Sequence, residues 1–193
     1  ISSGSSVVLD LSQMDHCDFN WSDGSEDALR IVQPTSNTTY VVTVTDIHGC
    51  TSVDDLFIEV NSLPTVDLGN DTTACQGTHV LLDAENPGGS YLWSIGATTQ
   101  SISINTNGTY EVTVTDANMC TTSDAITVNF MAPPLVSLEF GATICEGDQV
   151  TLDAGNLGSS YIWSTGATTL TINVSHAGTY GVTVSNGIGC LAS

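Results

Sequence analysis

Apolar and polar residues alternate with a period of two over short stretches of this chain, and no stretch shows a sustained 3.6-residue stripe. A period of two is typical of half-buried β-strands, because successive side chains point to opposite faces of a sheet. Turns rich in glycine and asparagine separate the alternating stretches. The pattern therefore predicts antiparallel β-sandwiches. In the clearest region the expected strands are Thr65–Leu68, His79–Asp83, Ser90–Trp93, Thr99–Ile104, Thr109–Thr115 and Ala125–Asn129.

One block of sequence recurs along the chain. Residues Tyr91–Cys120 return as Tyr161–Cys190, and Phe19–Cys50 is a looser copy of the same block. The matched tryptophans, tyrosines and cysteines of the two closer copies all lie 70 residues apart. A fixed period is the signature of a tandem array. It divides the chain into a first, a second and a third module, residues 1–64, 65–134 and 135–193.

The first and third modules differ from the second at the two ends of the chain. The first has no counterpart of the opening strand Thr65–Leu68, and the third has none of the closing strand Ala125–Asn129. We therefore expect the sequence to be an excerpt of a longer protein. Proline-containing linkers at Asn61–Pro64 and Met131–Pro134 join the modules. Because proline restricts its own backbone and the residue before it, we expect semi-rigid spacers and an extended rod.

The charge of the chain excludes two classes of partner. Its 193 residues contain 21 Asp and Glu against a single basic residue, Arg30, which gives a formal net charge of −20 at pH 7. Binding to nucleic acids and to anionic membrane surfaces depends on Lys and Arg, so we expect neither. No apolar run approaches the roughly 18 residues of a membrane span, so we expect no membrane insertion.

The six cysteines, two per module, predict disulfides and hence an oxidising, extracytoplasmic compartment. The first module lacks one recurring cysteine and gains another, Cys17, ahead of its tryptophan. This exchange favours pairing within modules, as Cys17–Cys50, Cys75–Cys120 and Cys145–Cys190. The alternative is pairing across the junctions, as Cys50–Cys75 and Cys120–Cys145.

The recurring aromatic residues have two interpretations. As a platform on an exposed face they would stack on sugar rings, whereas in a sandwich they fill the gap between sheets. We favour the core, because the tyrosines alternate in phase with buried-type valines of the same strand. The predicted core aromatics are Trp21, Trp93, Trp163, Tyr40, Tyr110 and Tyr180.

The motifs of the second module are recognisable. The run L-G-N-D-T-T-x-C, V-x-L-D-A, Y-x-W-S-x-G-A-T-T and G-T-Y-x-V-T-V, followed by Cys, resembles Ig-like, PKD-like repeats in large surface and secreted proteins of Bacteroidota. Those repeats typically occur in gliding-motility and adhesion proteins exported by the type IX secretion system. The resemblance is strongest over Val66–Ser193, although the WDFGDG signature of PKD repeats is missing. It implies an Ig-like stalk or adhesive module on the bacterial cell surface, and it names no ligand.

The sequence also offers candidates for a calcium site and for an O-glycosylation site. Carboxylates near a module junction could hold calcium, which binds oxygen ligands, and the candidates are Asp67, Asp71, Asp54 and Asp55. The alternative is that such residues bond nearby backbone amides at turns and strand ends. Thr72 follows an aspartate in a predicted exposed turn and resembles an O-glycosylation acceptor of this bacterial group.

Catalytic motifs are missing from the sequence. It contains no nucleophile elbow, no HExxH and no Gly-rich phosphate loop, so we expect no enzyme. Our first hypothesis is a structural and adhesive stalk segment of an extracellular surface or filament protein, with neighbouring modules as partners. The second is a module that binds a glycan or protein, for which Thr98, Thr99 and Gln100 would be exposed beside an aromatic residue. The third is a fibre subunit that exchanges strands.

Overall fold

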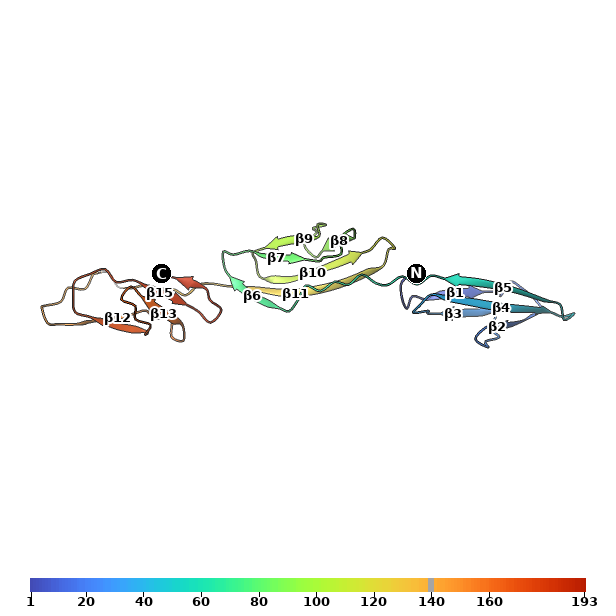
Figure 1. Cartoon of the computed structure of the whole chain (residues 1–193), viewed down its shortest axis with the longest axis horizontal. Helices are drawn as coiled ribbons and strands as arrows, with labels where there is room; N and C mark the ends of the chain where they lie inside the picture. Colours follow the sequence, from blue (N-terminus) through green and yellow to red (C-terminus); the bar gives the residue numbers. More distant parts are fainter. Residues whose placement is uncertain (139–140) are drawn as a thin grey trace. The chain divides into compact units, whose positions relative to one another are not determined.

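The computed structural model describes residues 1–138 and 141–193, and over these ranges the chain forms sixteen β-strands and no helix (Figure 1). The all-β, Ig-like sandwich class predicted from the alternation is confirmed. No helix in the described ranges has the length and apolar character of a membrane span. The strands are β1 (Val7–Asp10), β2 (Cys17–Trp21), β3 (Leu29–Val32), β4 (Thr38–Asp46), β5 (Thr51–Ile58), β6 (Thr72–Cys75), β7 (Val80–Asp83), β8 (Ser90–Trp93), β9 (Ser101–Ile104), β10 (Gly108–Thr115), β11 (Thr121–Met131), β12 (Val150–Asp153), β13 (Ser160–Trp163), β14 (Thr171–Val174), β15 (Val182–Ser185) and β16 (Leu191–Ala192).

Each sheet draws its strands from one of the three predicted modules. The first module has the sheets β1-β3 and β2-β4-β5, the second has β7-β9 and β6-β11-β10-β8, and the third has β12-β14 and β13-β15-β16. Contacts between Cα atoms group the described residues into two compact units. One unit comprises residues 1–67, 84–100 and 112–124, and the other comprises residues 68–83, 101–111 and 125–193.

The structure differs from the predicted strands at the start of the second module. No strand covers Thr65–Leu68, so that prediction is wrong. Instead β6, which we expected to be a turn, pairs in parallel with β11 and places Cys75 opposite Met131. The sequence of β6, Thr-Thr-Ala-Cys, carries no apolar alternation, because the strand lies at the edge of its sheet and is only partly covered. Periodicity therefore could not detect it.

The inward-facing residues of the strands form apolar cores. In the first module the buried cluster surrounds Trp21, and in the third it surrounds Trp163. Alternate strand residues supply these side chains, as the period of two requires. The buried members are Leu9, Phe19, Trp21, Val32, Val42 and Ile58 in one cluster, and Ala154, Tyr161, Trp163, Ile172, Val174, Val182 and Val184 in the other.

The same tight turn follows each tryptophan. At Trp93, the backbone N–H donates to the Ala97 carbonyl at 2.9 Å, and the Gly96 N–H donates to the Trp93 carbonyl at 2.8 Å. The indole Nε1–H donates to the Thr99 carbonyl at 2.8 Å. Equivalent bonds form at the other two tryptophans. Gly96 has a φ of 82°, a left-handed conformation that glycine adopts without a steric penalty, which explains the glycine of the W-S-x-G motif.

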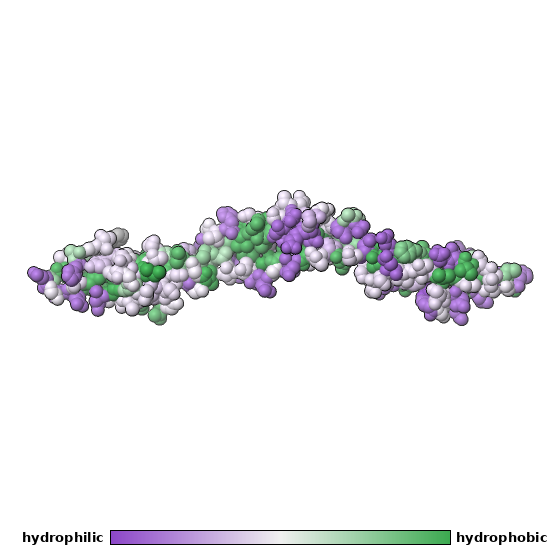
Figure 2. All heavy atoms as spheres, viewed as in Figure 1, coloured by the Kyte–Doolittle hydropathy of each residue, from purple (hydrophilic) through white to green (hydrophobic). Residues whose placement is uncertain are grey.

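Apolar side chains also remain on the surface, interspersed with hydrophilic ones (Figure 2). Val8 on β1 and Ile31 on β3 are cross-strand partners, and their side chains are 58% and 70% exposed. A cross-strand pair of this kind stabilises a sheet by about 0.2–1 kcal/mol. These two residues therefore support a sheet of only two strands from its outer face.

Candidate functional site

One kind of turn, which we call the Asx turn, ends in a cysteine in every module. In the third module the Oδ1 of Asn186 accepts the N–H groups of Ile188 and Cys190 at 3.2 and 2.9 Å. The Asn186 N–H donates to the Cys190 carbonyl at 3.1 Å. The turns Asp46–Cys50 and Asp116–Cys120 form the same bonds. These bonds hold each cysteine in one fixed position directly before the next strand.

A second kind of turn, which we call the glycine turn, begins with the other recurring cysteine. In Cys75–Thr78 and Cys145–Asp148 the N–H of the fourth residue donates to the carbonyl of the first at 3.1 Å in both turns. The first module has the same turn at Ser2–Ser5, also with a 3.1 Å bond. The glycine at the third position has a φ between 76° and 93° in all three turns, which positions the first residue in the same way.

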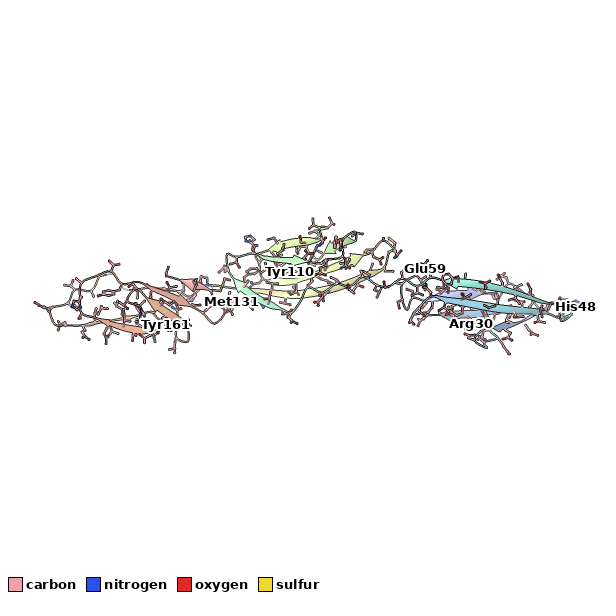
Figure 3. All side chains as sticks on the ribbon, in the orientation of Figure 1. Arg30, His48, Glu59, Tyr110, Met131 and Tyr161 are labelled. Carbon is pink, nitrogen blue, oxygen red and sulfur yellow. A yellow bond between two sulfur atoms is a disulfide. The ribbon has the colours of Figure 1, made fainter. Side chains whose placement is uncertain are left out.

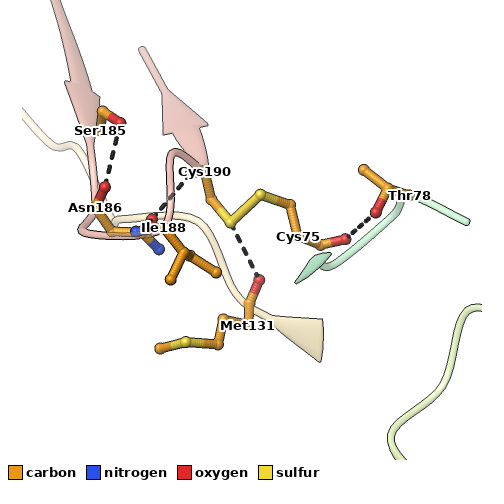
Figure 4. Close-up of a disulfide and its surroundings, with 7 residues drawn as sticks. All are labelled: Cys75, Thr78, Met131, Ser185, Asn186, Ile188 and Cys190. Carbon is orange, nitrogen blue, oxygen red and sulfur yellow. Dashed lines mark hydrogen bonds between the residues drawn. A yellow bond between two sulfur atoms is a disulfide. The ribbon is translucent and has the colours of Figure 1, made fainter. Parts of the chain in front are cut away.

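The disulfide in the described chain joins one turn of each kind. Cys75 of a glycine turn is bonded to Cys190 of an Asx turn, with 5.5 Å between the Cα atoms (Figure 4). The Cys190 Sγ also lies 3.9 Å from the Met131 carbonyl, at the end of the strand that pairs with Cys75. Both cysteines belong to the same compact unit. The bridge therefore ties the second module to the third across a sequence separation of 115 residues.

The pairings that we predicted for Cys75 and Cys190 are wrong, because the two recurring cysteines of a module lie at opposite ends of a strand. Cys75 is opposite Met131, the last residue of β11, whereas Cys120 directly precedes the first residue of that 11-residue strand. At about 3.3 Å per residue the strand is roughly 36 Å long, and a disulfide needs Cα atoms within about 7 Å. The alternative pairing Cys50–Cys75 fails too, because Cys75 is bonded to Cys190.

Cys17 and Cys50 lie on the two sides of β4. Cys17 on β2 is the Cα partner of Asp46 on β4, and Cys50 bonds Asp46 at the other edge. Two strand spacings amount to about 9.6 Å, beyond the reach of a disulfide. The structure accordingly has free thiols at Cys17, Cys50, Cys120 and Cys145.

The recurring aromatic residues lie in or against the cores. Trp21, Trp93 and Trp163 are only 6%, 1% and 2% exposed. Tyr110 is buried, and Tyr40 and Tyr180 are half-buried against the clusters of their modules. Tyr110 and Tyr161 are labelled in Figure 3. The Tyr110 and Tyr180 hydroxyls donate to the carbonyls of Thr106 and His176 at 2.8 and 2.9 Å, which fixes the connection before each strand.

This burial bears on the glycan-binding hypothesis. Thr98, Thr99 and Gln100 are exposed, as that hypothesis requires, but Trp93 of the same turn points into the core. A sugar platform needs the face of an aromatic ring in solvent. The tryptophan turn therefore does not provide one.

The calcium candidates do not assemble into a recognisable site. In the described part of the chain, no three His, Cys, Asp or Glu residues come together in a way that could hold a metal ion. The Asp71 carboxylate accepts the Thr127 N–H at 2.8 Å, and Asp54 and Asp55 are exposed on β5. Asp67 is exposed as well. Calcium binding stays an untested prediction.

Thr72, the predicted glycosylation acceptor, is exposed but does not lie in a turn. It begins β6 and is the Cα partner of Val128. The prediction of a turn at Thr72 is wrong because β6 carries no apolar alternation, so the sequence pattern does not indicate a strand there. An acceptor on an edge strand still has its side chain in solvent, so modification remains a prediction.

The third module contains a groove of ≈710 Å³ beside its glycine turn. Leu138, Val150 and Tyr180 line it together with Cys145 and Glu146. In the second module the equivalent edge is occupied by β11, which pairs in parallel with β6. Residues 141–145, the counterpart of β6, form no strand. The groove therefore lies at the position in the third module that corresponds to the closing strand β11 of the second module.

The single basic residue has a structural role in the first module (Figure 3). The Arg30 guanidinium lies 5.0 Å from the centroid of the Trp21 ring and forms an ion pair with Asp23. The Arg30 guanidinium donates a hydrogen bond to the Asp23 carboxylate, and this bond lowers the pKa of Asp23. A second hydrogen bond, from the Ser25 N–H, lowers it further. Hydrogen bonds from the Ser12 hydroxyl and N–H lower the pKa of Asp10. Both carboxylates are therefore stabilised in their charged form.

We expect the first module to lose stability in acid through these carboxylates. A lowered folded-state pKa contributes stability that is fully present above the unfolded pKa of Asp, about 3.9, and is lost as the pH falls through the folded value. Urea unfolding between pH 7 and pH 2 should show a smaller acid-dependent loss for Asp23→Asn than for the unchanged chain. Asp18→Asn, on the exposed face of β2, is the matched control. An acid loss of equal size in Asp23→Asn and the unchanged chain would contradict the assignment.

Comparisons with known proteins assign the chain to no family. No protein-family model and no curated protein matches the chain. Among solved structures, a Bacteroides ovatus surface glycan-binding protein in complex with a mixed-linkage heptasaccharide matches 98% of this chain and 60% of its own length, at 17% identity and a TM-score of 0.27. A bacterial ice-binding adhesin matches 97% of this chain and 83% of its own, at 15% identity and a TM-score of 0.37.

The N-terminal eight Ig domains of Down Syndrome Cell Adhesion Molecule (DSCAM) are also similar to this chain. It matches 100% of this chain and 38% of its own length, at 15% identity and a TM-score of 0.30. The chain therefore spans about 60% of the length of the glycan-binding protein and a smaller share of the length of DSCAM. At these scores the likenesses carry no argument about ligand or partner.

Proposed function

We propose that this chain is a stalk segment of an extracellular cell-surface protein, in which a disulfide locks the second Ig-like module to the third. The observation that carries the proposal is the Cys75–Cys190 bridge. A disulfide that stabilised one module would close a loop inside it, whereas this bridge joins residues of two modules. A covalent link between successive modules limits their motion and transmits tension, which is what a stalk requires.

Four further observations support the proposal. A disulfide is maintained in an oxidising compartment. The recurring Trp, Tyr and Asx positions serve cores and turns, so the repeated sequence specifies a scaffold. The resemblance to Bacteroidota repeats favours the cell surface of such a bacterium, with export by the type IX secretion system. The net charge of −20 keeps neighbouring stalks apart by repulsion.

Small-angle X-ray scattering of the oxidised chain tests the stalk. Three modules about 36 Å long, placed end to end, give a rod of roughly 110 Å with a radius of gyration near 30 Å. One compact body of this length would have a radius of gyration of about 16 Å. We expect the larger value. We also expect the second and third modules to contribute to the scattering profile as one stiff rod. A value near 16 Å would contradict the proposal.

The groove of the third module favours strand exchange as a second candidate function. Its apolar lining and the unpaired edge at residues 141–145 match the slot that β11 fills in the second module. A synthetic peptide with the sequence Ala125–Met131 is the probe. We expect it to bind the third module and to protect the Cys145 thiol from alkylation. Undiminished alkylation at saturating peptide would rule out this candidate.

A further inference from the structure

An asparagine side chain holds the chain where it enters the second and the third module. The Asn86 Nδ2 group donates to the Thr65 carbonyl at 2.6 Å and to the Ala84 carbonyl at 2.8 Å. The Asn156 Nδ2 group donates to the Leu135 carbonyl at 2.7 Å and to the carbonyl two residues before it at 3.1 Å. Both N–H groups of each amide are thereby used. We call the pairs Asn86–Thr65 and Asn156–Leu135 the entry clasps.

The backbone of these two asparagines has a conformation that suits glycine better. Asn86 and Asn156 have φ values of 55° and 56°. In this left-handed region a side chain carries a steric cost that glycine avoids, although asparagine tolerates it better than most residues. Asparagine therefore provides something at these positions that glycine cannot. The amide bonds to the chain that enters the module account for it.

A tyrosine hydroxyl fixes the backbone of each entry clasp. The hydroxyls of Tyr91 and Tyr161 donate to the carbonyls of the clasp asparagines of their own modules, at 2.6 and 2.8 Å. The first module has Phe19 at the matching position, and the loop before it, residues 11–16, contains no asparagine. The tyrosine of the Y-x-W motif and the clasp asparagine therefore occur together in two modules and are both replaced in the other.

A second asparagine holds the chain where it leaves the first and the second module. The Asn37 Oδ1 accepts the Val60 N–H at 2.8 Å, and the Asn107 Oδ1 accepts the Phe130 N–H at 2.6 Å. We call the pairs Asn37–Val60 and Asn107–Phe130 the exit clasps. An asparagine amide has both a donor and an acceptor group, so the same residue type can hold a carbonyl at one end of a module and an N–H at the other.

The clasps bracket the two linkers at equivalent positions. In each junction an exit clasp holds one residue and an entry clasp holds the residue five positions later. The held residues are Val60 and Thr65 in the first junction, and Phe130 and Leu135 in the second. Four residues lie between them, 61–64 and 131–134, and both segments end in proline. Proline restricts the backbone further, so each linker has little freedom to bend.

We infer that these four asparagines are positioning residues, which set the length of chain that can bend between successive modules. The inference rests on the proposed stalk function and names the residues that keep its joints short. When an entry clasp is lost, the mobile segment extends from the linker into the module that follows. A longer mobile segment makes a joint more flexible, and a flexible joint weakens a stalk as a spacer.

Asn86→Gly tests an entry clasp. Glycine adopts a φ of 55° without a steric penalty, so the substitution removes the amide bonds and leaves the turn. Nitrogen-15 relaxation of the oxidised chain reports on the Val66 N–H, which shares a peptide plane with the held Thr65 carbonyl. We expect an order parameter of about 0.85 in the unchanged chain and below about 0.6 in Asn86→Gly.

Asn156→Gly is the matched control. It should lower the order parameter at Val136 and leave the value at Val66 unchanged, whereas Asn86→Gly should do the reverse. Tyr91→Phe should lower the order at Val66 by a smaller amount, because the amide bonds remain after the hydroxyl is lost. Amide exchange in β8 and β10 should stay slow in Asn86→Gly, which separates loss of the clasp from general unfolding of the second module.

Hydrogen exchange tests the exit clasps at the N–H groups that they hold. Asn107→Ala should speed exchange of the Phe130 amide about fivefold, the factor that one hydrogen bond typically contributes. Asn37→Ala should have the same effect on the Val60 amide and none on Phe130. Each substitution thus serves as the control for the other.

Two results would overturn the inference. One is an order parameter at Val66 that does not fall in Asn86→Gly, and the other is a loss of order at both junctions from that single substitution. Failure of the stalk gives a different result, since a compact radius of gyration of the unchanged chain contradicts the stalk whatever the order of the linkers. A rod-like chain with an unchanged Val66 would contradict the clasps alone.

Discussion

Pulling the chain from its two ends should release roughly 40 nm more length after the Cys75–Cys190 bridge is reduced. The bridge closes a sequence separation of 115 residues, and an unfolded chain extends by about 3.3–3.6 Å per residue. While the bridge is intact, the residues inside this loop cannot bear tension even when they unfold. Single-molecule force spectroscopy with and without reductant measures the difference in contour length.

The bridge should also stabilise the modules that it joins. Closing a loop of this length contributes about 5 kcal/mol by the chain-entropy estimate. Cys75→Ser should therefore lower the urea midpoint of the second and third modules strongly. Cys17→Ser is the matched control, since its thiol is free. Equal contour lengths in the oxidised and reduced chain would show that the bridge is absent in solution.

Replacing Trp163 by alanine should unfold the third module first. The side chain is 2% exposed, and its Nε1–H donates to the Thr169 carbonyl at 2.8 Å. Removing a large buried aromatic side chain costs about 3–5 kcal/mol, which is a large part of the stability of a module of this size. Amide hydrogen exchange should show loss of protection in β13 and β15 while β8 and β10 remain protected.

Ile162→Ala is the control for this substitution. Ile162 is the neighbour of Trp163 on β13, but its side chain faces solvent and is 65% exposed. An exposed substitution of this kind changes stability by about 0.5 kcal/mol or less. If Ile162→Ala and Trp163→Ala had similar effects, the burial of the tryptophan would not explain the recurrence of the Y-x-W strand.

The period-two alternation predicts those strands that have one face in a core. Strands β7, β8, β9 and β10 lie within about one or two residues of the predicted ranges, a difference typical of strand ends. Tyr110, Val112 and Val114 occupy every second position of β10, and the alternation correctly places all three on the buried face. The edge strand β6 has no such signal, because backbone hydrogen bonds to β11 define it and its side chains are only partly covered.

The disulfide could not be derived from cysteine spacing for a different reason. Spacing along the chain says which cysteines recur, but pairing depends on which end of the module each occupies. The parallel pairing of β6 with β11 puts Cys75 at the end where the chain leaves the second module. The turn before β11 puts Cys120 at the other end. Only the direction of β6, which the sequence does not reveal, distinguishes a link to the next module from a link inside one.

The length of the bridged loop has a consequence for damage by proteases. The separation of 115 residues between Cys75 and Cys190 exceeds the 70-residue period of the repeat. A single backbone cut anywhere inside the loop leaves both fragments covalently joined. A stalk built in this way keeps its anchor and its tip connected after a protease cuts the backbone inside the bridged loop.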